Sequence, residues 1–94
     1  MSPLIDASRG GMTELVQQLL DGDAPVDTND EDEDGWTALM WASQLAYGDG
    51  PHSKVVKLLL DRGASVHEKA KDGNTALMLA SEYGHTEVVK LLLD

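Results

Sequence analysis

The chain of 94 residues contains no cysteine and no phenylalanine. The absence of cysteine excludes a disulfide scaffold, a thiolate metal site and a cysteine nucleophile, and it fits a reducing compartment, the cytoplasm or the nucleus. Aromatic residues make up only 4% of the sequence, so leucine, valine, methionine and alanine must supply the core. Apolar runs are short, so the sequence predicts neither a signal peptide nor a membrane-spanning segment. This length corresponds to one small domain.

Basic residues are scarce. Lysine and arginine number 7 against 17 acidic residues, which gives a net charge of -10 and disfavours binding to nucleic acid or to an anionic membrane. Residues 1–50 hold eleven of the acids and a single base, Arg9, so the whole net charge lies in this half. Residues 27–34 alone carry six carboxylates. Because like charges at this density repel, we expect the acidic run to stay extended and solvated.

An internal repeat runs through the chain. Residues 34–43 recur as residues 72–81, and residues 55–61 recur as residues 88–94. A diverged first copy is found in residues 3–8 and 15–21. The offsets fit a period of 33 residues with two insertions, one of two residues in the acidic run and one of five residues near 46–50.

Each unit is predicted to form a short helix, a turn, a second helix and a glycine-led loop. Ser2, Thr37 and Thr75 stand where a helix N-cap hydroxyl is expected. In residues 55–60 and 88–93 the apolar side chains follow the i, i+3, i+4 spacing of an amphipathic helix. Gly63 after Arg62 marks a helix end with glycine in the left-handed conformation.

These segments resemble the ankyrin repeat. The turn Gly84-His85, the helix segment beginning Val88-Val89 and the closing pair Gly63-Ala64 match its pattern, and the resemblance covers essentially the whole chain. It implies an all-α solenoid of three stacked helix-turn-helix units joined by hairpin-like loops. The repeats are predicted at residues 1–29, 30–67 and 68–94, the second carrying the insertion near 46–50 and the third cut short. The family motif is altered at Ala38 and Ala76 in place of proline, Met40 and Met78 in place of histidine, and Ala70 in place of a hairpin aspartate. We expect these departures to loosen the hairpins and caps without changing the fold.

Catalytic candidates are almost absent. His52 and His85 occupy the same turn position in successive units, and His67 lies in a loop. Equivalent atoms in adjacent helices lie about 10 Å apart, which is too far to share a metal ion. The sequence offers no oriented partner for a general base, so we interpret the turn histidines as structural and predict neither enzyme activity nor a cofactor.

The acidic run also contains the opening of a calcium-binding loop, Asp30-x-Asp32-x-Asp34-Gly35. The twelfth position of such a loop needs a bidentate acid and is Trp41 here. Aspartate and glycine at these positions are also ordinary for a hairpin tip of this repeat. We therefore favour a hairpin and predict no metal site.

The few aromatic residues are candidates for binding. Trp36 lies between the second hairpin-like loop and the following helix, and Tyr83 directly precedes Gly84. In the resembled family both positions face the concave groove, so Trp36, Tyr83 and Leu45, which is equivalent to Tyr83 one unit earlier, could form one patch. Packing of Trp36 on the neighbouring hairpin is the alternative. We expect Trp41 to be partly buried, whereas Tyr47 in the insertion could either cover the turn or project outward.

The leading functional hypothesis is a protein-protein interaction module. The partner would bind in the groove of hairpin tips and first helices, and a basic peptide or patch would fit the acidic run beside an indole face. The predicted partner-binding residues are Glu31, Asp32, Glu33, Asp34, Trp36, Leu45, Tyr47 and Tyr83.

The alternative hypothesis is self-association, or a place within a longer array. The last helix carries Val88, Val89, Leu92 and Leu93 with no polar capping repeat after it. Solenoids need a polar outer face on the terminal repeat. We therefore expect several of these side chains to be exposed, either because the chain is a fragment of a longer array or because copies associate through them.

Overall fold

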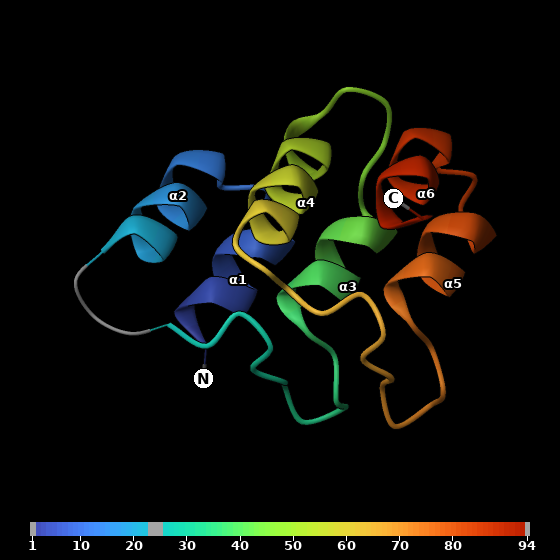
Figure 1. The fold of residues 1–94 in the computed structure, drawn as a ribbon, viewed down its shortest axis with the longest axis horizontal. Helices are drawn as coiled ribbons and strands as arrows, with labels where there is room; N and C mark the ends of the chain where they lie inside the picture. Colours follow the sequence, from blue (N-terminus) through green and yellow to red (C-terminus); the bar gives the residue numbers. More distant parts are fainter. Residues whose placement is uncertain (1, 23–25, 94) are drawn as a thin grey trace.

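The computed structural model describes residues 2–22 and 26–93 and arranges them as three helix pairs (Figure 1). The first helices of the pairs are α1 (Pro3–Arg9), α3 (Ala38–Gln44) and α5 (Ala76–Glu82), and the second helices are α2 (Thr13–Asp21), α4 (Pro51–Asp61) and α6 (Thr86–Leu93). Along one layer α1 packs on α3 and α3 on α5, while in the other α2 packs on α4 and α4 on α6. This is the predicted all-α stack. The predicted repeat boundaries stay a prediction, and Asp94 lies outside the described residues.

The first helices begin where the cap hydroxyls were predicted. Thr37 Oγ1 accepts a hydrogen bond from the Met40 N–H at 3.3 Å, and Thr75 Oγ1 accepts one from the Met78 N–H at 3.2 Å. The hydroxyl of Ser2 does the same for α1, with proline at the first helical position. The caps are thus formed in all three repeats, because the Ser or Thr hydroxyl can make this bond whatever residue follows it, and the expected loosening of the caps stays a prediction.

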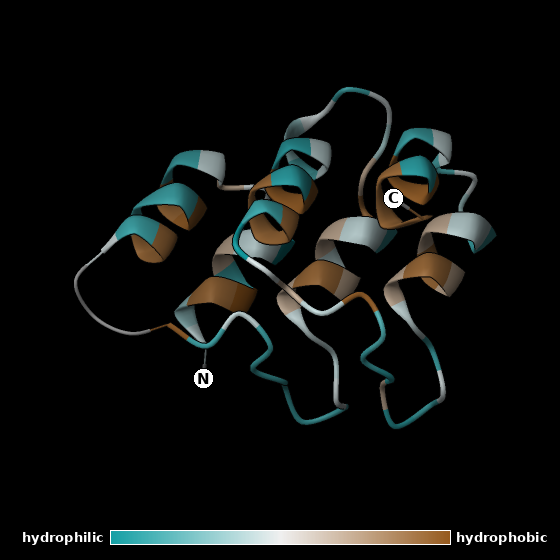
Figure 2. Cartoon of the chain, in the orientation of Figure 1, coloured by the Kyte–Doolittle hydropathy of each residue, from teal (hydrophilic) through white to brown (hydrophobic). Residues whose placement is uncertain are grey.

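The core lies between the two helix layers. Figure 2 shows the second helices turning their hydrophobic side toward the first helices and their hydrophilic side outward. Val55, Val56 and Leu59 of α4 are fully buried there, while Ala42 and Ala80 allow the first helices to approach closely. None of the described helices combines the length and the apolar character needed to cross a bilayer.

The turn histidines tie each second helix to the preceding repeat. The Nε2–H of His52 donates to the carbonyl of Arg9, the last residue of α1, at 2.7 Å. The Nε2–H of His85 donates to the carbonyl of Gln44, the last residue of α3, over the same distance. Each bond satisfies a carbonyl at the end of a helix that has no partner within that helix. The turn histidines thus have the structural role predicted for them.

The last helix exposes fewer of its apolar side chains than the several that the sequence predicts. Val88 and Leu92 are buried because α6 turns them toward α5 and α4. Val89 is partly buried against the core, and Leu93 alone of the four is largely exposed. Repeat three therefore buries two of the four apolar side chains of α6, in contacts with α5 and with α4 of the preceding repeat.

Two buried serines give a stability prediction. Ser8 and Ser43 hold equivalent positions in α1 and α3, and neither hydroxyl has a hydrogen-bond partner among the described residues. An unpaired buried hydroxyl is destabilising, so Ser43→Ala is expected to raise the free energy of unfolding by about 1 kcal/mol. Urea denaturation measures this change.

Ser81 is the matched control because it occupies the same position in α5 and is exposed. Ser81→Ala should raise the free energy of unfolding by roughly 0.5 kcal/mol or less, because alanine differs from serine there only in helix propensity. Equal gains at the two sites, or a loss at Ser43, would contradict the explanation.

Candidate functional site

The acidic run folds into turns, which corrects the expectation of an extended segment. The Asp27 carboxylate accepts a hydrogen bond from the Asn29 N–H at 2.9 Å, and the Asp30 N–H donates to the Asp27 carbonyl. Asp32 then begins a hairpin in which its N–H donates to the Trp36 carbonyl at 2.9 Å. Like-charge repulsion is outweighed because the aspartate side chains hydrogen-bond the backbone of their own turns.

The next hairpin has the same design and packs beside the first. The Ala70 N–H donates to the Asn74 carbonyl at 2.8 Å, so the hairpin forms with alanine in place of the family aspartate. The Lys71 N–H donates to the Asp34 carbonyl at 3.0 Å and joins the two tips. Gly35 is required at this contact, since its φ is 79° and a Cβ there would lie 3.0 Å from the Lys71 nitrogen.

Asp32 organises the first hairpin. Its Oδ1 accepts hydrogen bonds from the Asp34 and Trp36 N–H groups, and its Oδ2 accepts one from the Trp41 indole Nε1–H at 2.9 Å. Burial raises the pKa of the Asp32 carboxyl, but the Trp36, Trp41 and Asp34 donors, with the nearby Arg9 charge, together hold its pKa below the ordinary value. The carboxylate is therefore charged at neutral pH.

The two tryptophans lie beside this carboxylate. The ring centroids of Trp36 and Trp41 are 4.5 Å apart, with their planes tilted by 42°. The guanidinium carbon of Arg9 lies 4.4 Å from the Trp41 ring centroid, a cation–π contact. Trp41 is half-buried, as predicted, while Trp36 is half-buried and packs against both the core and Trp41.

A pocket of about 710 Å³ opens between the hairpin and α1. It is lined by Ser2, Ile5, Asp6, Arg9, residues 30–34 and Trp41. Carboxylates dominate its wall, and Glu31, Glu33 and Asp34 are exposed. The pocket therefore places negative charge next to the Trp41 ring, which already contacts the Arg9 guanidinium.

A second group of aromatic residues forms at the other end of α3. The Tyr47 ring meets the His85 ring edge-on at 4.6 Å, and the Tyr83 ring stacks on His85 at 6.0 Å. The Gln44 side-chain amide donates to the Tyr83 hydroxyl at 3.4 Å. Tyr47 both covers the turn, through its contact with His85, and projects outward, since 62% of it is exposed. Tyr83 is exposed as well.

The structure divides the single patch predicted from Trp36, Leu45 and Tyr83. Trp36 precedes α3 and Leu45 follows it as the C-cap, so the seven residues of the helix separate them. A helix of this length rises about 10 Å. Tyr83 lies with Gln44 and Tyr47 at the Leu45 end, because it caps α5 where Leu45 caps α3. Trp36 therefore belongs with the acidic hairpin instead.

The carboxylates of the hairpin were also considered as metal ligands in the sequence. Among the residues that the structure describes, no cluster of three or more histidine, aspartate or glutamate side chains is arranged to hold a metal ion. The Asp32 oxygens, which a calcium loop would direct at the ion, accept three protein hydrogen bonds. Trp41, at the position where that loop needs an acid, is one of the donors.

Sequence reasoning missed Arg9 and Trp41 as parts of this site. They are separated by 31 residues and meet because α1 stacks on α3, which carries Trp41 one turn from its start. One signal was available, since Arg9 is the only base in residues 1–50. A lone cation in a strongly acidic half-chain is expected to find an anionic or aromatic partner.

Comparison with known proteins places this architecture in a family. A family model for ankyrin repeats in three copies matches residues 4–94. The Escherichia coli (strain K12) protein YahD, whose name describes it as an ankyrin repeat protein, is 37% identical over 90 residues, which are 96% of this chain and 44% of that protein. Ankyrin repeat and SAM domain-containing protein 6 of Mus musculus is 42% identical over 93 residues, covering 97% of this chain and 10% of that protein.

Ankyrin repeat domain-containing protein 63 of Mus musculus is 36% identical over 90 residues, which are 96% of this chain and 23% of that protein. The chain thus spans less than half the length of each of these relatives. The matched residues include both hairpins and all three helix pairs except for Pro3 at the start of α1. The chain belongs to the ankyrin-repeat family.

Proposed function

We propose that this chain binds a protein with a basic segment, through the groove of hairpin tips and first helices. Ankyrin repeats are in general protein-protein interaction modules, and this proposal adds the chemistry of the partner. The observation that carries it is the acidic pocket beside Trp41, in which a guanidinium group already lies on the indole ring.

The exposed carboxylates are available to a partner. Within residues 2–22 and 26–93 no hydrogen bond or ion pair engages the side chains of Glu31 and Glu33. A guanidinium group can take two carboxylate oxygens at once and stack on an aromatic ring, which lysine does less well. An arginine of the partner would therefore bind more strongly than a lysine.

The Arg9 contact supports this preference for a guanidinium. Arg9 lies over one face of Trp41 in the same pocket that Glu31 and Glu33 line. Its position indicates that the carboxylates and the indole together stabilise a cation at this point. A partner arginine would use the exposed carboxylates of the hairpin and the accessible part of Trp36.

The tyrosines at the far end of α3 would supply an apolar anchor. Tyr47 and Tyr83 are exposed and surround the buried His85, with Leu45 half-buried at the end of the same helix. An extended chain advances about 3.3 Å per residue, so the rise of about 10 Å along α3 corresponds to about three residues. The proposed partner segment places an apolar residue three or four positions from its arginine.

The test reverses the charge of the hairpin. In Glu31→Lys with Glu33→Lys, association with a deca-arginine peptide should slow by about tenfold or more and lose most of its salt dependence, because electrostatic steering is removed. Stopped-flow tryptophan fluorescence at two salt concentrations measures both effects, with Trp36 and Trp41 as reporters.

Glu14→Lys with Glu87→Lys is the matched control. It makes the same change in net charge on α2 and α6, both exposed positions outside the pocket lining. The control should lower the association rate only slightly. Unchanged kinetics in the hairpin variant, or equal slowing in both variants, would overturn the proposed binding surface.

A further inference from the structure

The guanidinium of Arg9 is held only by the ring of Trp41. Its central carbon lies over that ring, 4.4 Å from the centroid. Among the residues that the structure describes, no hydrogen bond or ion pair engages this guanidinium, although it carries five N–H donors. The Arg9 side chain is exposed, and an exposed cation–π contact changes an equilibrium constant by only about two- to fivefold. Arg9 can therefore leave the ring at little cost.

The contact lies inside the proposed binding pocket. Arg9 and Trp41 both line it, together with the carboxylates of the acidic hairpin. The contact joins α1 to α3, which pack on each other, so it lies within the stack and not at one of its ends. The Trp36 ring is 4.5 Å from the Trp41 ring, and the Trp41 indole N–H donates to Asp32. A partner guanidinium can thus reach the face of Trp41 that Arg9 covers only by taking the place of Arg9.

Asp6 provides a second position for the Arg9 side chain. It lies three residues before Arg9 on α1, and both side chains are exposed and line the pocket. Residues three apart on a helix are neighbours, and an acid that precedes a base is the favourable order. Within residues 2–22 and 26–93 no ion pair engages the Asp6 carboxylate. A displaced Arg9 would therefore exchange its aromatic contact for an ion pair on the same helix.

Building on the proposed function, we propose that Arg9 determines specificity by competing with the partner's arginine for Trp41. The partner's arginine meets the hairpin carboxylates and the accessible part of Trp36, and then replaces Arg9 on the Trp41 ring while Arg9 moves to Asp6. This exchange replaces one guanidinium by another, so the carboxylate contacts decide whether it occurs. An ammonium group lacks the planar fork that binds two carboxylate oxygens and stacks on a ring, so a lysine leaves Arg9 in place.

Two consequences distinguish this competition from simple attraction of opposite charges. The unmodified chain loses part of the affinity that an open Trp41 ring would give to an arginine ligand, because the Arg9 contact must first be broken. A lysine ligand does not break that contact and loses less. Removing Arg9 should therefore favour an arginine peptide over a lysine peptide, whereas removing a positive charge elsewhere should favour both peptides equally.

Isothermal titration of the chain with deca-arginine and with deca-lysine tests the proposal. In Arg9→Gln the affinity for deca-arginine should rise by about two- to fivefold, which is the value of the contact that no longer has to be broken. The affinity for deca-lysine should rise less. Circular dichroism establishes that the variant is folded.

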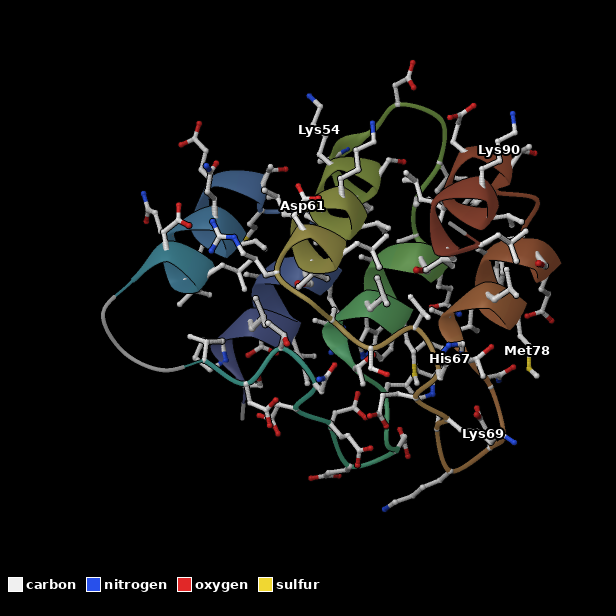
Figure 3. All side chains as sticks on the ribbon, in the orientation of Figure 1. Lys54, Asp61, His67, Lys69, Met78 and Lys90 are labelled. Atoms are coloured by element: carbon white, nitrogen blue, oxygen red, sulfur yellow. The ribbon has the colours of Figure 1, made fainter. Side chains whose placement is uncertain are left out.

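Lys54→Gln is the matched control. It removes the same charge from an exposed position on α4, and Figure 3 shows Lys54 pointing away from the body of the molecule, on the side opposite the hairpin tips. A charge so placed acts on the pocket only through a field that salt screens. Lys54→Gln should therefore raise the affinities for both peptides slightly and by the same factor.

The NMR signals of the Arg9 Cδ protons follow the displacement directly in the unmodified chain. The ring current of Trp41 shifts them upfield in the free chain, and saturation with deca-arginine should return them to their ordinary position, whereas deca-lysine should not. Deca-arginine binding that leaves these signals unmoved, or equal gains in Arg9→Gln and Lys54→Gln, would overturn the competition and leave the proposed function standing. If neither peptide binds the unmodified chain, the proposed function fails and the competition fails with it.

Discussion

Leu59→Ala is expected to lower the free energy of unfolding by about 3 kcal/mol. Leu59 is fully buried on α4, which packs between α2 and α6. Removing its side chain leaves a cavity that the helices on both sides help to line, so the structure can relax only partly. Urea denaturation followed by circular dichroism measures the loss.

The same residue type at the same register in all three repeats provides an internal series. Leu92 of α6 is buried but has no following repeat beside it among the described residues, and Leu19 of α2 is only half-buried. We expect the cost to fall from Leu59 to Leu92 to Leu19. The exposed Leu93 is the control, and its replacement by alanine should cost under about 0.5 kcal/mol.

This order follows from the one-dimensional character of the stack. Stability in such a protein is a sum of repeat and interface contributions, and the central repeat takes part in both interfaces. Because small domains are stable by only about 5–15 kcal/mol, a loss of about 3 kcal/mol in the Leu59 variant is roughly a fifth to three-fifths of the total stability. Equal losses in all three leucine variants would contradict this and indicate a single undivided core.

Much of the fold could be predicted because it depends on local chemistry that repeats. The cap hydroxyls of Thr37 and Thr75 act within their own first turn, and Gly63 adopts its expected left-handed φ of 82°. The apolar stripe of α4 needs only its i, i+3, i+4 spacing to predict which side is buried. Because these signals recur with a period of 33 residues interrupted by two insertions, the sequence predicts a stack of similar helix pairs.

The site was harder to predict because it depends on contacts between repeats. The six carboxylates of residues 27–34 predicted an extended run, because repulsion between like charges can be counted in a sequence. The hydrogen bonds from backbone N–H groups to the Asp27 and Asp32 side chains, which outweigh that repulsion, cannot be counted there. The placement of Arg9 on Trp41 requires the offset between α1 and α3, which the sequence does not contain. The burial of Val88 and Leu92 likewise depends on the direction in which α6 faces within its own pair.

Asp32→Ala is expected to lower the free energy of unfolding by about 2 kcal/mol, because three hydrogen bonds to a charged acceptor are lost from a partly exposed position. The hairpin itself should persist. Ala70 stands at the equivalent position in the next hairpin, and its backbone makes the same bonds without a carboxylate. The freed Trp41 indole should instead show a change in fluorescence emission, which distinguishes a local rearrangement from unfolding.

The pH dependence of Asp32→Asn tests the same carboxylate by its charge. Since the pKa of Asp32 is lowered in the folded chain, its stabilising effect is fully present above the unfolded value of about 3.9 and is lost as the pH falls through the folded value. The stability difference between the unmodified chain and Asp32→Asn should therefore be constant above about pH 5 and shrink below about pH 4. Asp49→Asn, which removes the same charge from an exposed loop position, should leave stability nearly unchanged. A difference for Asp32→Asn that does not depend on pH would mean that the shape of this side chain, and not its charge, holds the hairpin to Trp41.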